Sequence, residues 1–139
     1  TVKRGTHVIT VGFPNIDIQG KEPKLSEGIV SALSGIQDEP TVFQISVPIQ
    51  QGNSGGPMVD MDGNVVGIIA SKLSALYMLK NNGSVPENVN YAVKSSYLLS
   101  FLESVPEATT KLKEPETKER KFEDVVKSAE QAAVLVLVY

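Results

Sequence analysis

The chain has 139 residues, of which 41% are hydrophobic and 21% charged, and its formal net charge is −3. These values are typical of one globular domain and do not favour binding to nucleic acid or to an anionic surface. The sequence contains no cysteine, which excludes disulfide bonds, thiolate catalysis and cysteine-based zinc sites. The longest apolar run, AAVLVLVY, is much shorter than the roughly 20 residues of a membrane-spanning helix, so we expect no membrane span.

Short runs rich in β-branched residues, separated by turn residues, fill the first hundred positions. They predict six strands, which fall within residues 6–14, 26–35, 41–48, 57–61, 64–71 and 89–95. Asp62 and Gly63 form a strong signal for a hairpin with a two-residue loop between the fourth and fifth strands. A calcium loop of the EF-hand type is not expected there, because the required glutamate at the twelfth position is missing. Strands at this spacing predict an all-β barrel or sandwich.

The C-terminal third predicts two helices joined by a linker. The first helix is expected to begin at Ser95 or Ser96 and to end at Val105. Its apolar face would consist of Tyr97, Leu98, Phe101 and Leu102. Residues 107–121 are mostly charged and predict a solvated linker.

Residues 122–139 predict a short amphipathic helix followed by a buried apolar strand, VLVLVY. Such a strand has to pair or be covered, because an open apolar edge promotes aggregation. The sequence leaves open whether the open side of the barrel, another domain or another chain covers it.

The stretch QGNSGGPMVD, residues 51–60, surrounds one serine with glycines. Serine is a poor nucleophile and needs a base for its proton and donors for the oxyanion that forms. Gly52 permits a backbone conformation in which the N–H groups of Gly52 and Ser54 converge on one point. Gly55 and Gly56 keep side chains away from the acyl group. The alternative is a glycine-rich hairpin loop with an incidental serine, since the stretch is neither a phosphate loop nor an α/β-hydrolase elbow.

The longer segment GNSGGPMVDMDGNVVGI resembles the nucleophile segment of trypsin-like (chymotrypsin-fold) serine proteases, and most of all their bacterial high-temperature-requirement (Deg) branch. GTHVITVGFP, LSEGIVSAL and VNYAVKSSYLLSFLE are similar to other segments of this family and occur in the family's order. The resemblance runs from Gly5 to Glu103 and covers only the second of the family's two barrels. It implies an all-β fold, a six-stranded antiparallel Greek-key barrel with a C-terminal helix over residues 1–106. The linker 107–121 and the helix and strand of 122–139 would follow.

The resemblance also implies roles for residues of the serine loop. Ser54 would be the nucleophile, and the N–H groups of Gly52 and Ser54 would form the oxyanion hole. Four residues around the loop would line the primary specificity pocket: Ile49, Ile69, Ala70 and Ser71. No acidic residue lies just upstream of the loop, so we expect the pocket to accept a small or medium apolar side chain of the substrate rather than Lys or Arg. No metal or cofactor is expected, and the family favours an extracytoplasmic location.

The sequence lacks a base for this serine. Its only histidine, His7, falls at the start of a predicted strand and is expected to be an ordinary strand side chain. In the family, the catalytic histidine and aspartate belong to the first barrel and the inter-barrel region. We therefore expect the C-terminal half of a serine endopeptidase that cleaves polypeptides, nearly inert without its missing N-terminal barrel. Lys94 replaces a proline of the family, with no predicted consequence.

A non-catalytic module is the alternative function. One barrel kept without its catalytic partner would bind peptides, or form a homo-oligomer through the exposed inter-barrel face. Residues 125–139 would cover that face in their own chain or in a neighbour. The tail also resembles the segment that opens the first barrel of such proteases, which allows a further barrel to begin there. Leu76, Tyr77 and Leu79 of the loop before the sixth strand are expected to cover the barrel, and Asn82 is a glycosylation sequon.

Overall fold

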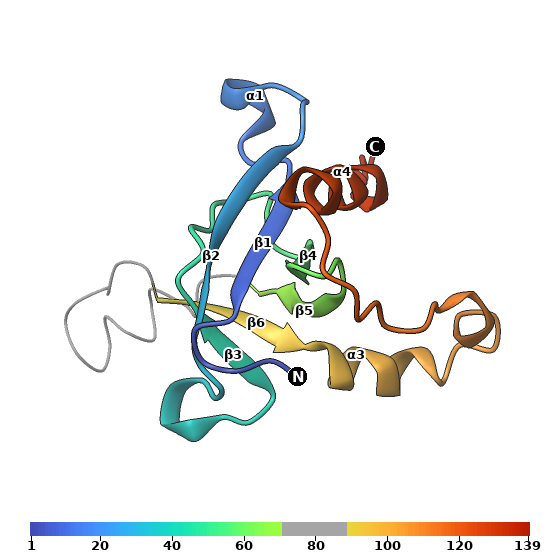
Figure 1. Ribbon diagram of the computed structural model, residues 1–139. Helices are drawn as coiled ribbons and strands as arrows, with labels where there is room; N and C mark the ends of the chain where they lie inside the picture. Colours follow the sequence, from blue (N-terminus) through green and yellow to red (C-terminus); the bar gives the residue numbers. More distant parts are fainter. Residues whose placement is uncertain (71–88) are drawn as a thin grey trace.

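The computed structural model describes residues 1–70 and 89–139 and contains a closed antiparallel barrel (Figure 1). The strands are β1 (His7–Gly12), β2 (Lys24–Ala32), β3 (Val42–Ile45), β4 (Pro57–Asp60), β5 (Val65–Ile69) and β6 (Asn90–Lys94). The helices are α1 (Ile16–Gln19), α3 (Ser95–Leu102) and α4 (Phe122–Ala132), with 3₁₀ turns η1 (Ile36–Asp38) and η2 (Thr109–Lys111). Around the barrel the order is β1-β2-β3-β6-β5-β4, and β1 closes it by pairing with both β2 and β4. The expected six-stranded barrel followed by a helix is confirmed.

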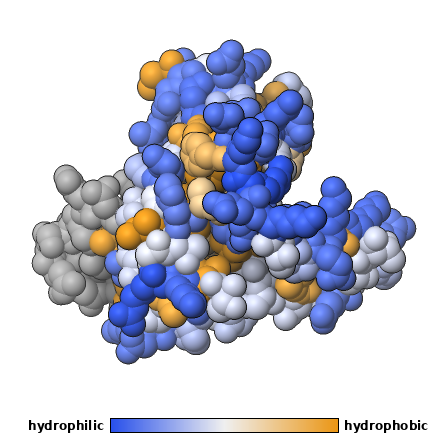
Figure 2. All heavy atoms as spheres, in the orientation of Figure 1, coloured by the Kyte–Doolittle hydropathy of each residue, from blue (hydrophilic) through white to orange (hydrophobic). Residues whose placement is uncertain are grey.

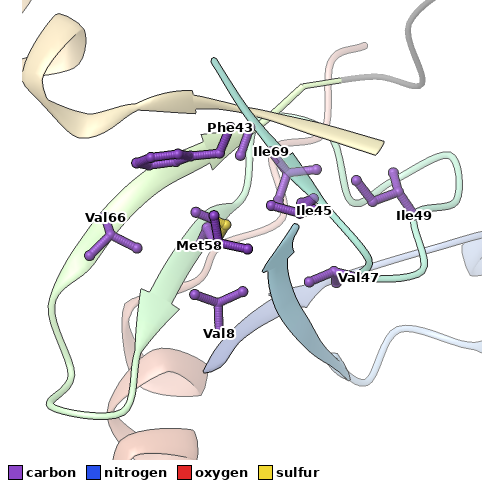
Figure 3. Close-up of a cluster of buried hydrophobic side chains, with 10 residues drawn as sticks. Val8, Phe43, Ile45, Val47, Ile49, Met58, Val66 and Ile69 are labelled. Carbon is purple, nitrogen blue, oxygen red and sulfur yellow. The ribbon is translucent and has the colours of Figure 1, made fainter. Parts of the chain in front are cut away.

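One hydrophobic cluster fills the interior of the barrel. It receives side chains from all the strands and from the segment between β3 and β4: Val8, Val30, Phe43, Ile45, Val47, Ile49, Met58, Val66, Ile69 and Ala92. Figure 3 draws these side chains between the strands and labels eight of them. Thr10 is also fully buried, and its hydroxyl donates a 2.7 Å hydrogen bond to the carbonyl oxygen of Pro57. This bond ties β1 to the start of β4, immediately after the serine loop.

A second cluster lies on the outer face of β1 and β4, where α4 packs. Ile9 and Val11 of β1 and Val59 of β4 contact Val125 and Ala129 of α4. Because α4 covers this face, β1 is buried on both faces from its second residue to its last. Figure 1 shows α4 beside β1, and the atoms facing the viewer over α4 in Figure 2 are mainly hydrophilic. α4 is therefore amphipathic, as its sequence predicts.

The hairpin between β4 and β5 forms where Asp62 and Gly63 predict it, but its loop has three residues instead of the two expected. The N–H of Asp60 donates to the carbonyl oxygen of Asn64 at 2.9 Å, which closes a loop of three residues. Gly63 takes a φ of +89°, the left-handed conformation that a three-residue hairpin loop requires. The Asp60 carboxylate accepts hydrogen bonds from the N–H groups of Asp62 and Asn64 and thereby stabilises the turn.

The charged linker is anchored to this hairpin at one point. The Asn64 side chain donates to the carbonyl oxygen of Glu116 at 2.7 Å, and its Oδ1 accepts from the N–H of Glu116 at 2.8 Å. Most residues of the linker are exposed, as a solvated segment would be. The two hydrogen bonds nevertheless fix the path by which the chain returns from α3 to α4 (Figure 1).

The C-terminal run VLVLVY does not form the buried strand that its composition predicts. Residues 133–139 belong to no strand, and Val134, Val136 and Val138 are 76%, 76% and 91% exposed. The physical reason lies in the barrel, whose six strands already pair in a closed ring and leave no free edge beside α4. α3 also departs from its prediction: it begins at Ser95 but ends at Leu102, and none of its residues is buried.

Candidate active site

The serine loop, residues 50–56, leaves the Ser54 side chain exposed on the surface of the barrel. Three hydrogen bonds hold its backbone: the N–H of Asn53 donates to the Gln50 carbonyl, that of Gly56 to the Asn53 carbonyl, and that of Gly55 to the Ile69 carbonyl. Their lengths are 3.0, 3.0 and 2.8 Å. The loop is therefore a folded turn fastened to the end of β5, and Ser54 lies at its tip.

Gly52 is required by the backbone on two counts. Its φ of +102° lies in a region that residues with a side chain rarely adopt. A Cβ atom added there would overlap the carbonyl oxygen of Phe13 and lie 2.8 Å from Cα of Pro14. The carbonyl oxygen of Gly52 also accepts a 3.3 Å hydrogen bond from the N–H of Phe13. The end of β1 thus packs directly on the loop, which explains the glycine that the sequence places two residues before Ser54.

The N–H groups of Gly52 and Ser54 donate no hydrogen bond to any atom of residues 1–70 and 89–139. Free backbone donors are uncommon in a folded loop, since buried ones are costly. Here both residues are exposed, so solvent or a ligand reaches them. An anion or a polarised carbonyl oxygen near Ser54 would find these two donors without competition from the described part of the chain.

Asn53 lies beneath the loop and is 3% exposed. Its Oδ1 atom is buried and has no hydrogen-bond partner among the described residues. A Cβ atom added at Gly12 would overlap this Oδ1 and lie 3.1 Å from Cα of Asn53. Asn53 therefore fills the space between the loop and the end of β1, directly before Ser54 in the chain.

The residues expected around a specificity pocket are found in different environments. Ile49 and Ile69 are 4% and 1% exposed and belong to the interior cluster, where Figure 3 shows both. Ala70 is half-buried, and its N–H donates to the Tyr91 carbonyl at 3.0 Å. Ser71 lies outside the described residues, as do Leu76, Tyr77, Leu79 and Asn82. The lining of a pocket by Ile49, Ile69, Ala70 and Ser71 therefore stays a prediction.

A cavity of about 450 Å³ opens next to Ser54. The end of β1, the serine loop and the segment that follows α4 enclose it: Val11, Gly12, Phe13, Gly52, Ser54, Gly55, Gly56, Pro57 and Ala132 to Val136. Sequence reasoning did not place the C-terminal segment at the serine loop. The only signal was the apolar tail in need of a cover, and no sequence pattern showed where the linker would bring it.

His7 is far from Ser54 along the barrel. It begins β1, whereas Gly12, which contacts Asn53, ends it. Five residues of an extended strand span about 17 Å. The His7 Nε2 atom lies 3.2 Å from Oε2 of Glu27, and both side chains are about half exposed. His7 is thus the ordinary strand side chain that the sequence predicts, and it lies out of reach of Ser54.

Three further observations concern Lys94, metal binding and membrane spans. The Lys94 Nζ atom lies 5.1 Å from the centre of the Phe43 ring, a cation–π contact where the resembled family has a proline. Among the described residues, no three His, Asp or Glu side chains gather closely enough to hold a metal ion. Within residues 1–70 and 89–139, no helix has the length and apolar character needed to cross a bilayer.

Comparison with known proteins identifies the family. The trypsin-like peptidase domain family matches residues 1–68. An uncharacterised protein of Sinorhizobium fredii, y4bJ, is 41% identical over 122 residues, which are 84% of this chain and 19% of that protein. A probable periplasmic DegP-like serine endoprotease of Pseudomonas fluorescens is 40% identical over 70 residues, which are 48% of this chain and 14% of the protease.

Among solved structures, the serine endoprotease from Yersinia pestis is similar with a TM-score of 0.55 and 25% identity. The match covers 75% of this chain and 32% of the Yersinia chain. The present chain thus spans less than a fifth of the two curated relatives. The barrel, the serine loop and these similarities agree, and together they support a fragment of a trypsin-like peptidase domain of the high-temperature-requirement (Deg) branch.

Proposed function

We propose that the chain carries the nucleophile of a serine endopeptidase, as the C-terminal half of its catalytic domain. One observation carries this proposal: Ser54 is exposed beside two backbone N–H groups, of Gly52 and Ser54, that have no acceptor among the described residues. The positive φ of Gly52 makes that arrangement possible. An incidental serine in a turn would not need a glycine whose Cβ is excluded by backbone atoms.

In the proposed reaction, the Ser54 Oγ atom attacks the carbonyl carbon of a peptide bond, and a base takes the hydroxyl proton. The carbonyl oxygen becomes an oxyanion that accepts hydrogen bonds from the N–H groups of Gly52 and Ser54. A single donor of this kind contributes about 10²- to 10³-fold to the rate. The intermediate then expels the amine, which receives the proton from the base, and leaves an acyl ester on Ser54. Water hydrolyses this ester with help from the same base.

The base is proposed to come from a segment that this sequence does not contain. The sequence has one histidine, and His7 stands at the opposite end of β1 from the loop. With the nucleophile and oxyanion hole but no base, a triad enzyme keeps about 10³- to 10⁴-fold over the uncatalysed reaction. This chain alone is therefore expected to be nearly inert, and its partner would be an N-terminal barrel that supplies histidine and aspartate.

The substrate is proposed to be a polypeptide with an apolar side chain before the cleaved bond. Ile49, Ile69 and Ala70 would provide the apolar surroundings, and no acidic residue stands near the loop in ISVPIQQ to attract Lys or Arg. The family resemblance supports these roles, together with an extracytoplasmic location.

The test is covalent labelling of Ser54 by a serine-directed fluorophosphonate in the longer protein that includes the preceding barrel. Mass spectrometry of the labelled peptide should place the label on Ser54, and Ser54→Ala should abolish labelling. Ser100→Ala, on the exposed side of α3, is the matched control and should label at the normal rate. An intact fold that leaves Ser54 unlabelled would refute the enzymatic function.

A non-catalytic assembly module is the second candidate, favoured by the apolar outer face of β1 and β4 that α4 covers. Removal of residues 107–139 would expose Ile9, Val11 and Val59. If the intact chain is monomeric and this truncated chain associates, the tail acts as a cover in its own chain. A concentration-dependent mass for the intact chain would instead support assembly through the tail. Light scattering at several concentrations distinguishes the two results.

A further inference from the structure

We propose that the segment after α4 and the serine loop together form a pocket for an extended peptide that carries an apolar side chain. The proposal rests on the proposed function only in taking a polypeptide as the ligand. The pocket is the cavity of about 450 Å³ that Ala132 to Val136 share with Ser54. None of Ile49, Ile69 and Ala70 lines it. It is therefore formed by other residues than the three described members of the specificity pocket that the family resemblance implies.

The packing of α4 determines the position of the tail. Val125 and Ala129 are 0% and 5% exposed against β1 and β4. The hydrogen bonds between Asn64 and Glu116 anchor the linker before α4 begins. At the other end, the N–H of Ala133 donates to the Ala129 carbonyl at 3.0 Å, and Ala133 is extended with φ −76° and ψ 137°. The chain thus leaves α4 in an extended conformation from a fixed point beside the end of β1.

The lining of the cavity selects for an uncharged ligand. The lining residues Val11, Phe13, Pro57, Leu135 and Val136 are apolar, and no lining residue carries a charge. The polar groups are the Ser54 hydroxyl and the backbone of the glycines. Ligand sites typically measure about 300 to 1,000 Å³ and are mostly apolar with a few polar groups that fix orientation. A single aliphatic or aromatic side chain fits this space, whereas a charged one would lose its hydration without gaining a partner.

The segment after α4 also has free backbone groups that could form hydrogen bonds with the main chain of a peptide. The N–H and carbonyl groups of Val134, Leu135 and Val136 form no backbone hydrogen bond with any described residue. An extended segment with free main-chain groups binds another extended segment by adding it as a strand. Across the cavity, the N–H groups of Gly52 and Ser54 are free as well. A peptide lying between the tail and the loop would therefore find main-chain partners on one side and carbonyl-binding donors on the other.

The tail also shows which of its side chains belongs to the pocket. Leu135 is half-buried and lines the cavity, whereas Val138 is 91% exposed and does not. Both are aliphatic residues of the same extended segment, outside every strand and helix. Replacing either with aspartate should leave the barrel folded, and this makes them a matched pair for a binding experiment.

The experiment measures binding of a fluorescein-labelled peptide, Gly-Ser-Leu-Ser-Leu-Ser-Gly, to the full chain by fluorescence anisotropy. A second peptide with aspartate in place of both leucines is the ligand control. We expect Leu135→Asp to weaken binding of the leucine peptide about tenfold or more, since it replaces apolar contact with a charge. Val138→Asp should change it less than about twofold, and the aspartate peptide should bind at least about tenfold more weakly. Circular dichroism checks that both variants fold.

Three results would overturn the proposal: equal affinities for the two variants, equal affinities for the two peptides, or no binding of the leucine peptide at millimolar concentration. A concentration-dependent mass of the free chain that Leu135→Asp abolishes would also overturn it, because a second copy would then occupy the pocket. Two separate readouts distinguish this proposal from the proposed function. Binding of the leucine peptide without fluorophosphonate labelling of Ser54 would refute the proposed function alone, and labelling of Ser54 without binding of the leucine peptide would refute this proposal alone.

Discussion

Replacing Gly52 with alanine should destabilise the barrel by about 2 to 5 kcal/mol. The φ of +102° is left-handed, and holding alanine there costs roughly 1 to 2 kcal/mol. The new Cβ would also overlap the Phe13 carbonyl oxygen and lie 2.8 Å from Cα of Pro14. These are backbone atoms, so the contact is relieved only by moving the end of β1 or the loop. Overpacking of this kind costs about 1 to 3 kcal/mol.

Gly55→Ala is the matched control. Gly55 has a φ of +83°, but a Cβ added there meets nothing within 4 Å. Gly55→Ala should therefore destabilise the chain only by the cost of holding alanine at a positive φ, roughly 1 to 2 kcal/mol. Urea unfolding followed by circular dichroism measures both variants, and at a slope of about 2 kcal/mol per molar urea, each kcal/mol shifts the midpoint by about 0.5 M. If Gly52→Ala unfolds at the same urea concentration as Gly55→Ala, the close approach of β1 to the loop is not as described.

Three other perturbations test the parts that bring the tail to the loop. Val125→Ala removes two methyl groups from a fully buried side chain and should cost at least about 1.6 kcal/mol in urea unfolding, whereas Val138→Ala should cost almost nothing. Asn64→Ala removes both hydrogen bonds to Glu116 and should increase hydrogen exchange at the Glu116 amide. Asn64→Asp keeps the acceptor oxygen and should increase this exchange less. Equal exchange in the unmodified chain and in both variants would contradict the anchoring role of Asn64. The N–H groups of Lys118 and Thr117 hold the pKa of the Glu116 carboxyl below its ordinary value of 4.5. Because this pKa is lowered in the folded chain, the ionised carboxylate stabilises the fold above pH 4.5, and the stabilisation is lost as the pH falls through the folded pKa. The protection of the Thr117 and Lys118 amides from hydrogen exchange should therefore be lost in acid. In Glu116→Gln, the protection of these amides should not depend on pH in this range.

The barrel could be predicted because its evidence is local. Each strand is a short β-branched run between turn residues, and Asp62 and Gly63 mark a hairpin whose glycine indeed takes a positive φ. The predicted loop length of two residues was wrong, because the loop is closed by the hydrogen bond between Asp60 and Asn64, which depends on the register of the two strands.

The run HVITVG in β1 shows the limit of pattern reading. Its apolar residues on both faces indicate a strand buried on both sides, but the sequence does not say by what. The interior accounts for Val8 and Thr10, while Ile9 and Val11 are buried only because α4, more than a hundred residues later, packs on them. The run VLVLVY forms no strand within the described chain for a related reason. Its composition favours a strand, yet a strand also needs a free edge, and the closed ring of six provides none beside α4.

The sequence by itself was enough to recognise a serine surrounded by glycines, the strands before and after it, and the lack of a histidine close to it in the chain. These follow from backbone sterics and from residue identity, which act over a few positions. Only the tertiary structure decided that Ile49 and Ile69 lie in the interior, that Asn53 supports the loop from below, and that the C-terminal segment stands across a cavity from Ser54. Those features depend on contacts between segments far apart in the chain, whose geometry is set by the closure of the barrel and by the return path of the linker.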